Sequence, residues 1–276
     1  MKYQALFSRA AFARTLVSVA LATAYASASA ALPPFTLNPA AVGLDGSAFT
    51  ADNILLSDFS TVTFSDSTHF SDTGYLSITG FQLGGGNIDA IGLNALPPGG
   101  TAGYSLFFHF TGTGTLTQGT GTTVASVPTF GNFDTLNYEL IGANGNSTFS
   151  TTGNVPAVHT FGTTQTLATG SLLHGIVSSA PYGDGTFVPS AAASLSFAVA
   201  SGKGDFFVSP KPFYNIALSA FTNTTSTVTA FDGGFTVNEG GGAMNFQAAP
   251  VPEPETYALM LAGLGAMGFV ARRRKA

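Results

Sequence analysis

The sequence predicts an all-β protein: a single β-sandwich or jelly-roll-like domain, flanked by an N-terminal signal helix and a C-terminal transmembrane helix. Three observations predict this fold class. Apolar and polar residues alternate in several runs, Gly, Asn, Asp and Pro cluster between the runs, and no internal segment shows a helical stripe. Many short strands separated by Gly-rich turns are typical of sandwiches and jelly rolls.

The first part of the chain, residues 1–30, has the composition of a secretory signal peptide. Lys2, Arg9 and Arg14 precede an apolar stretch that ends in Ala28-Ser29-Ala30. A basic region, an apolar region and a small-residue cleavage site in this order are read by signal peptidase. We expect cleavage after Ala30, with Ala28 and Ala30 as the small residues of the site.

The second part, residues 31–249, is the predicted secreted β-rich domain. Residues 104–120, residues 193–200 and parts of residues 213–238 alternate, and residues 56–70 and 73–83 are predicted to be two earlier strands. The run that starts at residue 104 has the clearest alternation, and one of its faces is predicted to be core. The predicted core face holds Tyr104, Leu106, Phe108 and Phe110. The opposite face holds Ser105, Phe107, His109 and Thr111.

Turn-forming residues separate the runs. The clusters are residues 84–87, 96–100, 142–146, 181–185 and 232–234. Gly, Asn and Asp adopt the backbone conformations that tight turns require, so these clusters predict connections between strands. The Pro- and Glu-containing stretch that begins near residue 248 predicts a hinge between the domain and the C-terminal tail.

The predicted domain is strongly acidic. Between residues 31 and 250 the chain has two Lys against twelve Asp or Glu, a net charge of −10, compared with −5 for the whole chain. Such a surface repels phosphate backbones, so we expect no nucleic-acid partner. The chain has no Cys, which excludes disulfides, thiol catalysis and thiolate metal sites.

No catalytic motif stands out, and we expect that the protein is not an enzyme. The sequence has no Gly-x-Ser-x-Gly elbow, no His-Glu-x-x-His and no P-loop. The four histidines, at positions 69, 109, 159 and 174, are scattered. Asp134 and Glu139 resemble a glycosidase pair, but a spacing of five residues places them on opposite faces of a regular strand.

No cofactor is expected, with calcium as the alternative. Acids beside Gly, Ser and Asn can supply the oxygen ligands that Ca²⁺ prefers. Such acids are Asp66 with Asp72, Asp184, and Asp89 at the end of a glycine-rich stretch similar to the calcium-binding nonapeptide. Ordinary turn chemistry also explains these residues, and we favour it because none of them follows a complete calcium motif.

The third part, residues 250–276, contains a short apolar run and a basic cluster. Residues 257–271 hold no charge and no Pro. As a helix they span roughly 22 Å at about 1.5 Å per residue, short of the roughly 30 Å of a bilayer core. The membrane stop is Arg272, Arg273, Arg274 and Lys275. We therefore expect the chain to be held transiently in the cytoplasmic membrane, with this basic cluster on the cytoplasmic side.

This third part closely resembles the PEP-CTERM sorting signal. Its elements occur in the order of that signal: Pro252-Glu253-Pro254, the apolar run and the basic cluster. The resemblance implies that exosortase, a membrane enzyme, recognises Pro252, Glu253 and Pro254 and processes the chain there. It also implies a secreted or surface protein of a Gram-negative bacterium that makes exopolysaccharide.

Two further segments resemble the flocculation-associated PEP-CTERM proteins. One is PFTLNPAAVGL followed by FTADNILLSDFSTVTF, and the other is GDFFVSPKPFYNIALSAF at residues 204–221. This resemblance implies a component of the extracellular matrix that supports floc or biofilm formation together with extracellular polysaccharide. We expect the acidic, Ser- and Thr-rich surface to contact acidic sugars through bridging cations.

Two other functions stay open. A carbohydrate-binding module with a defined sugar site would show exposed aromatic residues on a concave face. An enzyme that acts on matrix glycan would show two acids converging in a pocket. The candidate sugar-binding residues are Tyr75, Tyr104, Tyr138, Tyr182 and Tyr214.

Overall fold

The computed structural model describes residues 32–95, 101–118, 128–182 and 186–247. The predicted signal helix in residues 1–30 and the predicted transmembrane helix in residues 257–271 lie outside these ranges. Within the ranges, no helix has the length and apolar character needed to cross a membrane. The described chain consists of strands with two short 3-10 helices, so the all-β prediction is confirmed.

Long strands make up the main sheet, and shorter elements surround it. The long strands are β3 (Asn53–Phe64), β4 (His69–Leu83), β6 (Tyr104–Gln118), β7 (Thr129–Asn144), β10 (Thr164–Pro181), β11 (Phe187–Ser196), β14 (Ile216–Thr222) and β16 (Gly234–Gln247). The shorter elements are β1 (Phe35–Leu37), η1 (Pro39–Val42), β2 (Phe49–Ala51), β5 (Gly86–Ile88), β8 (Thr148–Thr152), β9 (Val155–His159), β12 (Ala198–Val199), β13 (Phe207–Ser209), η2 (Thr225–Thr227) and β15 (Val228–Phe231).

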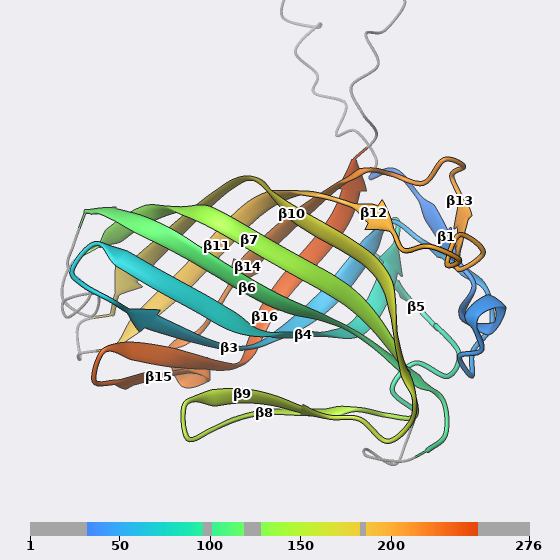
Figure 1. Cartoon of the computed structure of the whole chain (residues 1–276), viewed down its shortest axis with the longest axis horizontal. Coiled ribbons are helices and arrows are strands. Elements are labelled where there is room, and N and C mark those ends of the chain that lie inside the picture. Colours follow the sequence, from blue (N-terminus) through green and yellow to red (C-terminus); the bar gives the residue numbers. More distant parts are fainter. Residues whose placement is uncertain (1–31, 96–100, 119–127, 183–185, 248–276) are drawn as a thin grey trace, which may run out of the picture. The chain divides into compact units, whose positions relative to one another are not determined.

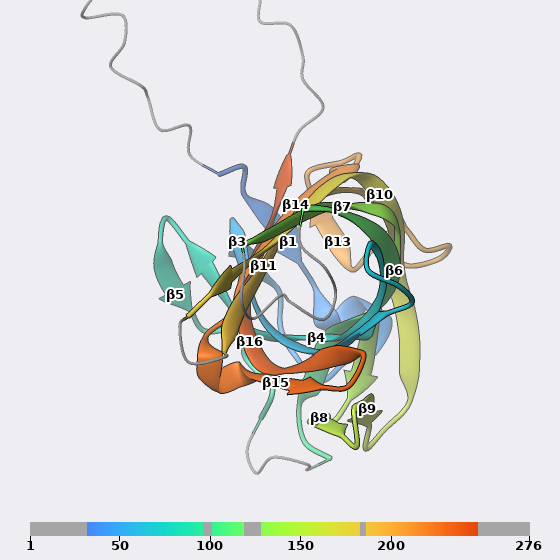
Figure 2. The same ribbon diagram turned by 90° about the vertical axis from the view of Figure 1, so that its left-hand side faces the viewer.

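The main sheet closes on itself, which corrects the predicted sandwich or jelly roll. In chain order, its eight long strands each pair antiparallel with the next, and β16 returns to pair with β3. The strands wrap around one interior instead of stacking as two sheets (Figures 1 and 2). Alternating apolar and polar residues suit both arrangements, so the pattern that predicted the strands did not distinguish them.

Bulges help this sheet to curve. Asp134 on β7 is an extra residue opposite the step from Thr113 to Gly114 on β6. Glu239 on β16 is another extra residue, and its φ of 64° lies in the left-handed region. An extra residue bends the strand and increases its local twist, which is what a sheet needs in order to close.

One predicted strand is divided in the structure. Residues 56–70 contain most of β3, a turn at residues 65–68 and the first two residues of β4. The Asp66 carboxylate stabilises this turn, because it accepts hydrogen bonds from the backbone N–H groups of Thr68 and His69 at 2.7 and 2.8 Å. The alternation continues across the turn, which made the two strands look like one.

Two apolar clusters fill the interior. The larger contains all four residues of the predicted core face, each at most 7% exposed, so that prediction is confirmed. The smaller contains Val62, Phe70, Leu116, Phe133, Phe187, Phe235 and Val237. Strand β1 lies between β2 and β13, and Phe35 on β1 packs its ring 5.0 Å from that of Phe246 on β16. These short strands therefore extend the larger cluster at one end of the ring, on the right in Figure 1.

A hairpin of β8 and β9 covers part of the outer face. Phe149 on β8 lies 5.5 Å from the ring of Phe59 and 5.4 Å from that of Phe107. Phe107 points away from the predicted core face, yet it is only 1% exposed because of this hairpin. The Thr61 hydroxyl donates a hydrogen bond to the Asn154 carbonyl at 2.9 Å, which ties the hairpin turn to β3.

Replacement of Phe108 by Ala should lower the free energy of unfolding by roughly 3–5 kcal/mol, because it removes a buried ring and leaves a cavity. The matched control is Phe130→Ala, since Phe130 is 50% exposed and its loss should cost less than about 1 kcal/mol. Denaturant unfolding of both variants measures the difference. Equal losses in the two variants would show that Phe108 does not lie in the core.

Candidate functional site

Two aspartates, Asp58 on β3 and Asp72 on β4, point into the closed sheet and are called the acid pair below. Alternate residues of β3 face the interior, and Asp58 occupies one of these positions with 8% exposure. In the register, Ser60 on β3 pairs with Gly74 on β4. Asp58 comes two residues before Ser60 on β3, and Asp72 comes two residues before Gly74 on β4. Gly74 carries no side chain, so the acid pair lies on either side of Ser60 across neighbouring strands.

Burial sets the electrostatics of the acid pair. It raises the pKa of Asp58 to about 7, against a smaller opposite effect of a hydrogen bond with Ser60. It also raises the pKa of Asp72 well above its usual value, and the nearby charge of Asp58 adds to that increase. Removal of a carboxylate from water favours its neutral form, and two like charges disfavour double ionisation. Burial and mutual repulsion therefore both shift the acid pair towards its neutral forms.

The acid pair borders two adjoining cavities of about 80 and 60 Å³ inside the sheet. Their walls are mostly apolar, and Phe133 and Phe221 line both. The larger cavity also receives the side chains of Ser179 and Asn223. Among the described residues, Asp58 and Asp72 line both cavities, and no Lys, Arg or His lines either one.

The motifs in the sequence do not point to the acid pair, although an acid such as Asp58 at the inward phase of an apolar strand is a detectable signal. The calcium alternative places Asp72 with Asp66, but the structure separates them: Asp72 faces the interior and Asp66 lies in an exposed turn.

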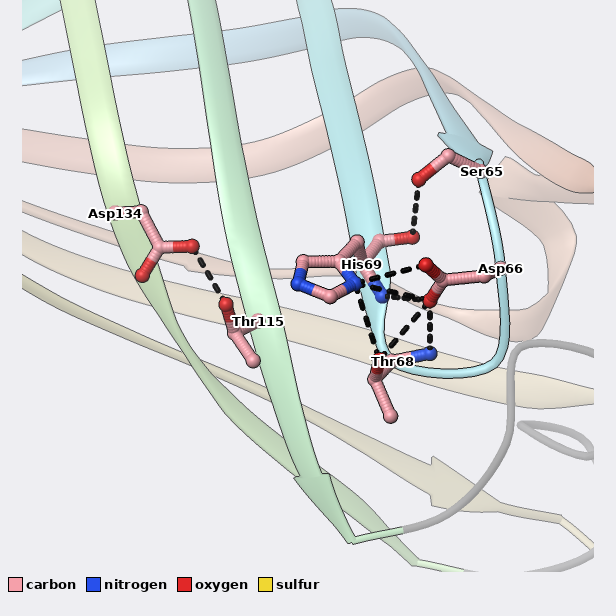
Figure 3. Close-up of polar contacts among 6 residues, drawn as sticks. All are labelled: Ser65, Asp66, Thr68, His69, Thr115 and Asp134. Carbon is pink, nitrogen blue, oxygen red and sulfur yellow. Dashed lines mark hydrogen bonds and ion pairs between the residues drawn. The ribbon is translucent and has the colours of Figure 1, made fainter.

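The Asp66 turn is held by hydrogen bonds within the chain (Figure 3). The Asp66 carboxylate accepts from the Thr68 backbone N–H, the Thr68 hydroxyl at 2.9 Å and the His69 backbone N–H, and it contacts His69 Nδ1 at 2.9 Å. These bonds, that from the Thr68 N–H foremost, hold the pKa of Asp66 well below its usual value. The arrangement is that of a capped turn.

The remaining calcium alternatives also fall in turns or outside the described chain. The glycine-rich stretch forms the β4–β5 turn, where Gly84 and Gly85 have positive φ and the Gly84 N–H donates to Asp52 Oδ2 at 2.7 Å. Asp184 lies outside the described residues. In the described ranges no three His, Cys, Asp or Glu residues gather as a metal site would require. The expectation of no cofactor, with calcium as the alternative, stays a prediction.

Asp134 and Glu139 lie exposed on β7 and have separate partners. Asp134 Oδ2 accepts a hydrogen bond from the Thr115 hydroxyl on β6 at 2.6 Å (Figure 3). Glu139 Oε2 accepts one from the Thr166 hydroxyl on β10 at 3.3 Å. The bulge at Asp134 breaks the regular alternation on which the opposite-face prediction depended. Neither acid lines the interior cavities.

The five candidate tyrosines do not share one exposed face. Tyr104 and Tyr138 are core residues at 0% and 4% exposure, and the Tyr138 hydroxyl donates to the Ser196 carbonyl at 2.7 Å. Tyr75 stacks on His109 with ring centroids 5.0 Å apart. Tyr214 donates to the Pro34 carbonyl at 3.0 Å, and Tyr182 is 70% exposed.

The predicted processing residues lie outside the described chain: Ala28, Ala30, Pro252, Glu253, Pro254, Arg272, Arg273, Arg274 and Lys275. Residues 250–275 match the family model of the PEP-CTERM protein-sorting motif. No curated protein and no solved structure matches the chain. The narrower resemblance to flocculation-associated proteins, the signal peptide and the transmembrane helix stay predictions.

Because of the acid pair, we expect the free energy of unfolding to depend on pH. The folded chain keeps the Asp58 proton up to a pH of about 7, whereas the unfolded chain releases it near 3.8. The stability contributed by this proton is complete below pH 3.8 and is lost as the pH rises through about 7. Asp58→Asn should therefore raise the free energy of unfolding at pH 8, by at most about 4 kcal/mol, and make its decline between pH 5 and 8 shallower.

Denaturant unfolding at several pH values measures this effect. The matched control is Asp232→Asn, because Asp232 lies exposed in the β15–β16 turn and its replacement makes the same change in charge. Identical pH profiles for the two variants would contradict the burial of Asp58.

Proposed function

We propose that this chain, which carries a PEP-CTERM sorting motif, is a secreted protein of the cell surface or extracellular matrix. Exosortase processes it, and it supports floc or biofilm formation together with exopolysaccharide. The observation that carries this proposal is the match of residues 250–275 to the sorting motif. That motif indicates an exported exosortase substrate of a Gram-negative bacterium, and the matrix role is the further step.

The proposed pathway contains two cleavages, one near each end of the sequence. Signal peptidase cleaves after Ala30 during export. Residues 257–271 then hold the chain in the cytoplasmic membrane, with the basic cluster on the cytoplasmic side. Exosortase recognises Pro252, Glu253 and Pro254 and releases the β-rich domain from its anchor.

The outer surface of the domain supports a role beside acidic polysaccharide. Hydroxyl pairs lie across neighbouring strands, as between Thr63 and Ser71 at 2.8 Å and between Thr113 and Thr135 at 2.8 Å. Lys203 and Lys211 are the basic residues of the domain against its twelve acids. Hydroxyl groups can bond sugars directly, and carboxylates can share divalent cations with acidic sugars.

A carbohydrate-binding module is the second candidate. Phe130 and Tyr182 favour it, because both rings are at least half exposed and they lie near the neighbouring ends of β7 and β10. Exposed aromatic rings can stack on sugar rings. A glycan-acting enzyme has less support, since the acid pair is enclosed by apolar walls that offer a sugar few hydrogen-bond partners.

Simultaneous replacement of Pro252, Glu253 and Pro254 by Ala should block maturation and leave the domain folded. Intact-mass measurement should find the wild-type protein at the surface without residues 1–30 and without the basic tail. The variant should accumulate uncleaved in the cytoplasmic membrane, and cells should settle less although polysaccharide is still made.

The matched control is Pro250→Ala with Glu255→Ala, which changes the same residue types just outside the tripeptide. Surface protein that still ends in the basic cluster would contradict exosortase processing. Normal aggregation by cells with membrane-trapped protein would contradict the matrix role.

A further inference from the structure

Four buried polar atoms around the larger cavity have no hydrogen-bond partner among the described residues. They are Asp58 Oδ1, Asp72 Oδ1, Ser179 Oγ and Asn223 Oδ1. A buried polar atom without a partner has lost its hydrogen bonds to water without a replacement, which destabilises the fold. Several such atoms around one cavity therefore indicate a site that is completed by another molecule.

Asn223 is held in place by the protein. Its side chain is buried, with 6% exposure, and Nδ2 donates a hydrogen bond to the Pro189 carbonyl on β11 at 3.1 Å. Its backbone N–H donates to the same carbonyl at 3.3 Å. Since Nδ2 is engaged there, Oδ1 is left as an acceptor. A side chain at Gly240 would overlap Asn223 Oδ1, so the neighbouring strand leaves space for this amide.

The polar groups of the site can accept hydrogen bonds, and none of them is basic. Carboxylate and amide oxygens accept hydrogen bonds, and a serine hydroxyl can also accept one. The titratable residues that line the two cavities are Asp58, Asp72 and Tyr138, from β3, β4 and β7. The cavity linings from β6, β10, β11, β14 and β16 contribute no titratable side chain. Once the acid pair is ionised, the site offers acceptors and negative charge, which match a hydrogen-bond donor that carries positive charge.

We infer that this cavity binds a small organic ammonium ion, a primary amine with a short apolar chain. The ammonium group has three N–H donors for the acid pair and Asn223, and the apolar chain matches the phenylalanine walls. Ca²⁺ suits the site less well, because it requires six to eight oxygen ligands and the walls are mostly apolar.

The cavity has the size and access for such a ligand. A volume of about 10–15 Å³ holds one water molecule, so about 80 Å³ accommodates a short aliphatic chain. Phe64 and Val177 line the cavity and pack with the smaller apolar cluster, yet both remain partly exposed. Part of the cavity lining is therefore accessible to solvent.

Binding is coupled to ionisation of the acid pair. The ammonium ion enters with its charge, the acid pair ionises, and its proton leaves to the solvent. The affinity should therefore rise with pH by about tenfold between pH 6 and 8, as the ionised fraction of a group that titrates near neutrality increases. This inference is independent of the matrix role, because it rests on the interior of the domain.

Calorimetric titration of the protein recovered from cells tests the inference, with n-butylammonium chloride as the probe. n-Butanol is the matched neutral probe and should bind at least about tenfold more weakly at pH 8. Asp58→Asn should weaken butylammonium binding by about tenfold or more and remove most of its pH dependence. Asp232→Asn makes the same charge change on the surface and should leave the affinity unchanged.

Several results would overturn the inference. They are the absence of butylammonium binding, equal affinity for n-butanol, and equal effects of Asp58→Asn and Asp232→Asn. Displacement of butylammonium by calcium chloride, with calcium binding that is lost in Asp58→Asn, would instead identify a metal site. Thermal unfolding of each variant confirms that it is folded before titration.

Discussion

The pairing of β3 with β16 is the constraint on which the rest of the structure depends. Each of the other pairings in the ring joins strands that follow one another in chain order. This pairing alone in the ring joins its first and last strands, with Ile54 opposite Met244 and Thr63 opposite Gly234. It encloses the interior, so that residues of the other long strands surround the cavity beside Asp58 on β3. A closed sheet also has no free edge along its long strands.

The interior contains opposing contributions to stability. Phenylalanine-rich clusters bury large apolar surface, and the chain has no Cys that could add a disulfide. The acid pair works against this, because burial of carboxylates without a basic partner favours their neutral forms and lowers stability at high pH. The two proposed roles therefore belong to different parts of the chain. The tail is the sorting signal, and the interior of the domain is the proposed ligand-binding site.

The sequence predicted local structure better than it predicted enclosure. Phe108 and its neighbours alternate clearly, and the strand period alone placed them in the core. The same period could not reveal the covering of Phe107 by Phe149, since that contact joins distant segments. Closure could not be predicted either, because a sandwich has the same alternation. The inward position of Asp58 can be read from the alternation, but its place in one cavity with Asn223 cannot, because Asn223 follows β14 and lines that cavity only in the closed ring.

The absence of natural Cys permits a direct measurement of closure. Leu55 on β3 and Ala243 on β16 are register partners, so Leu55→Cys with Ala243→Cys should form a disulfide within one molecule under mild oxidation. Thr113→Cys with Thr135→Cys joins neighbouring strands and serves as the positive control. The closed sheet predicts loss of both thiols in each variant by mass spectrometry after alkylation. Oxidation of the control pair with free thiols at positions 55 and 243 would contradict it.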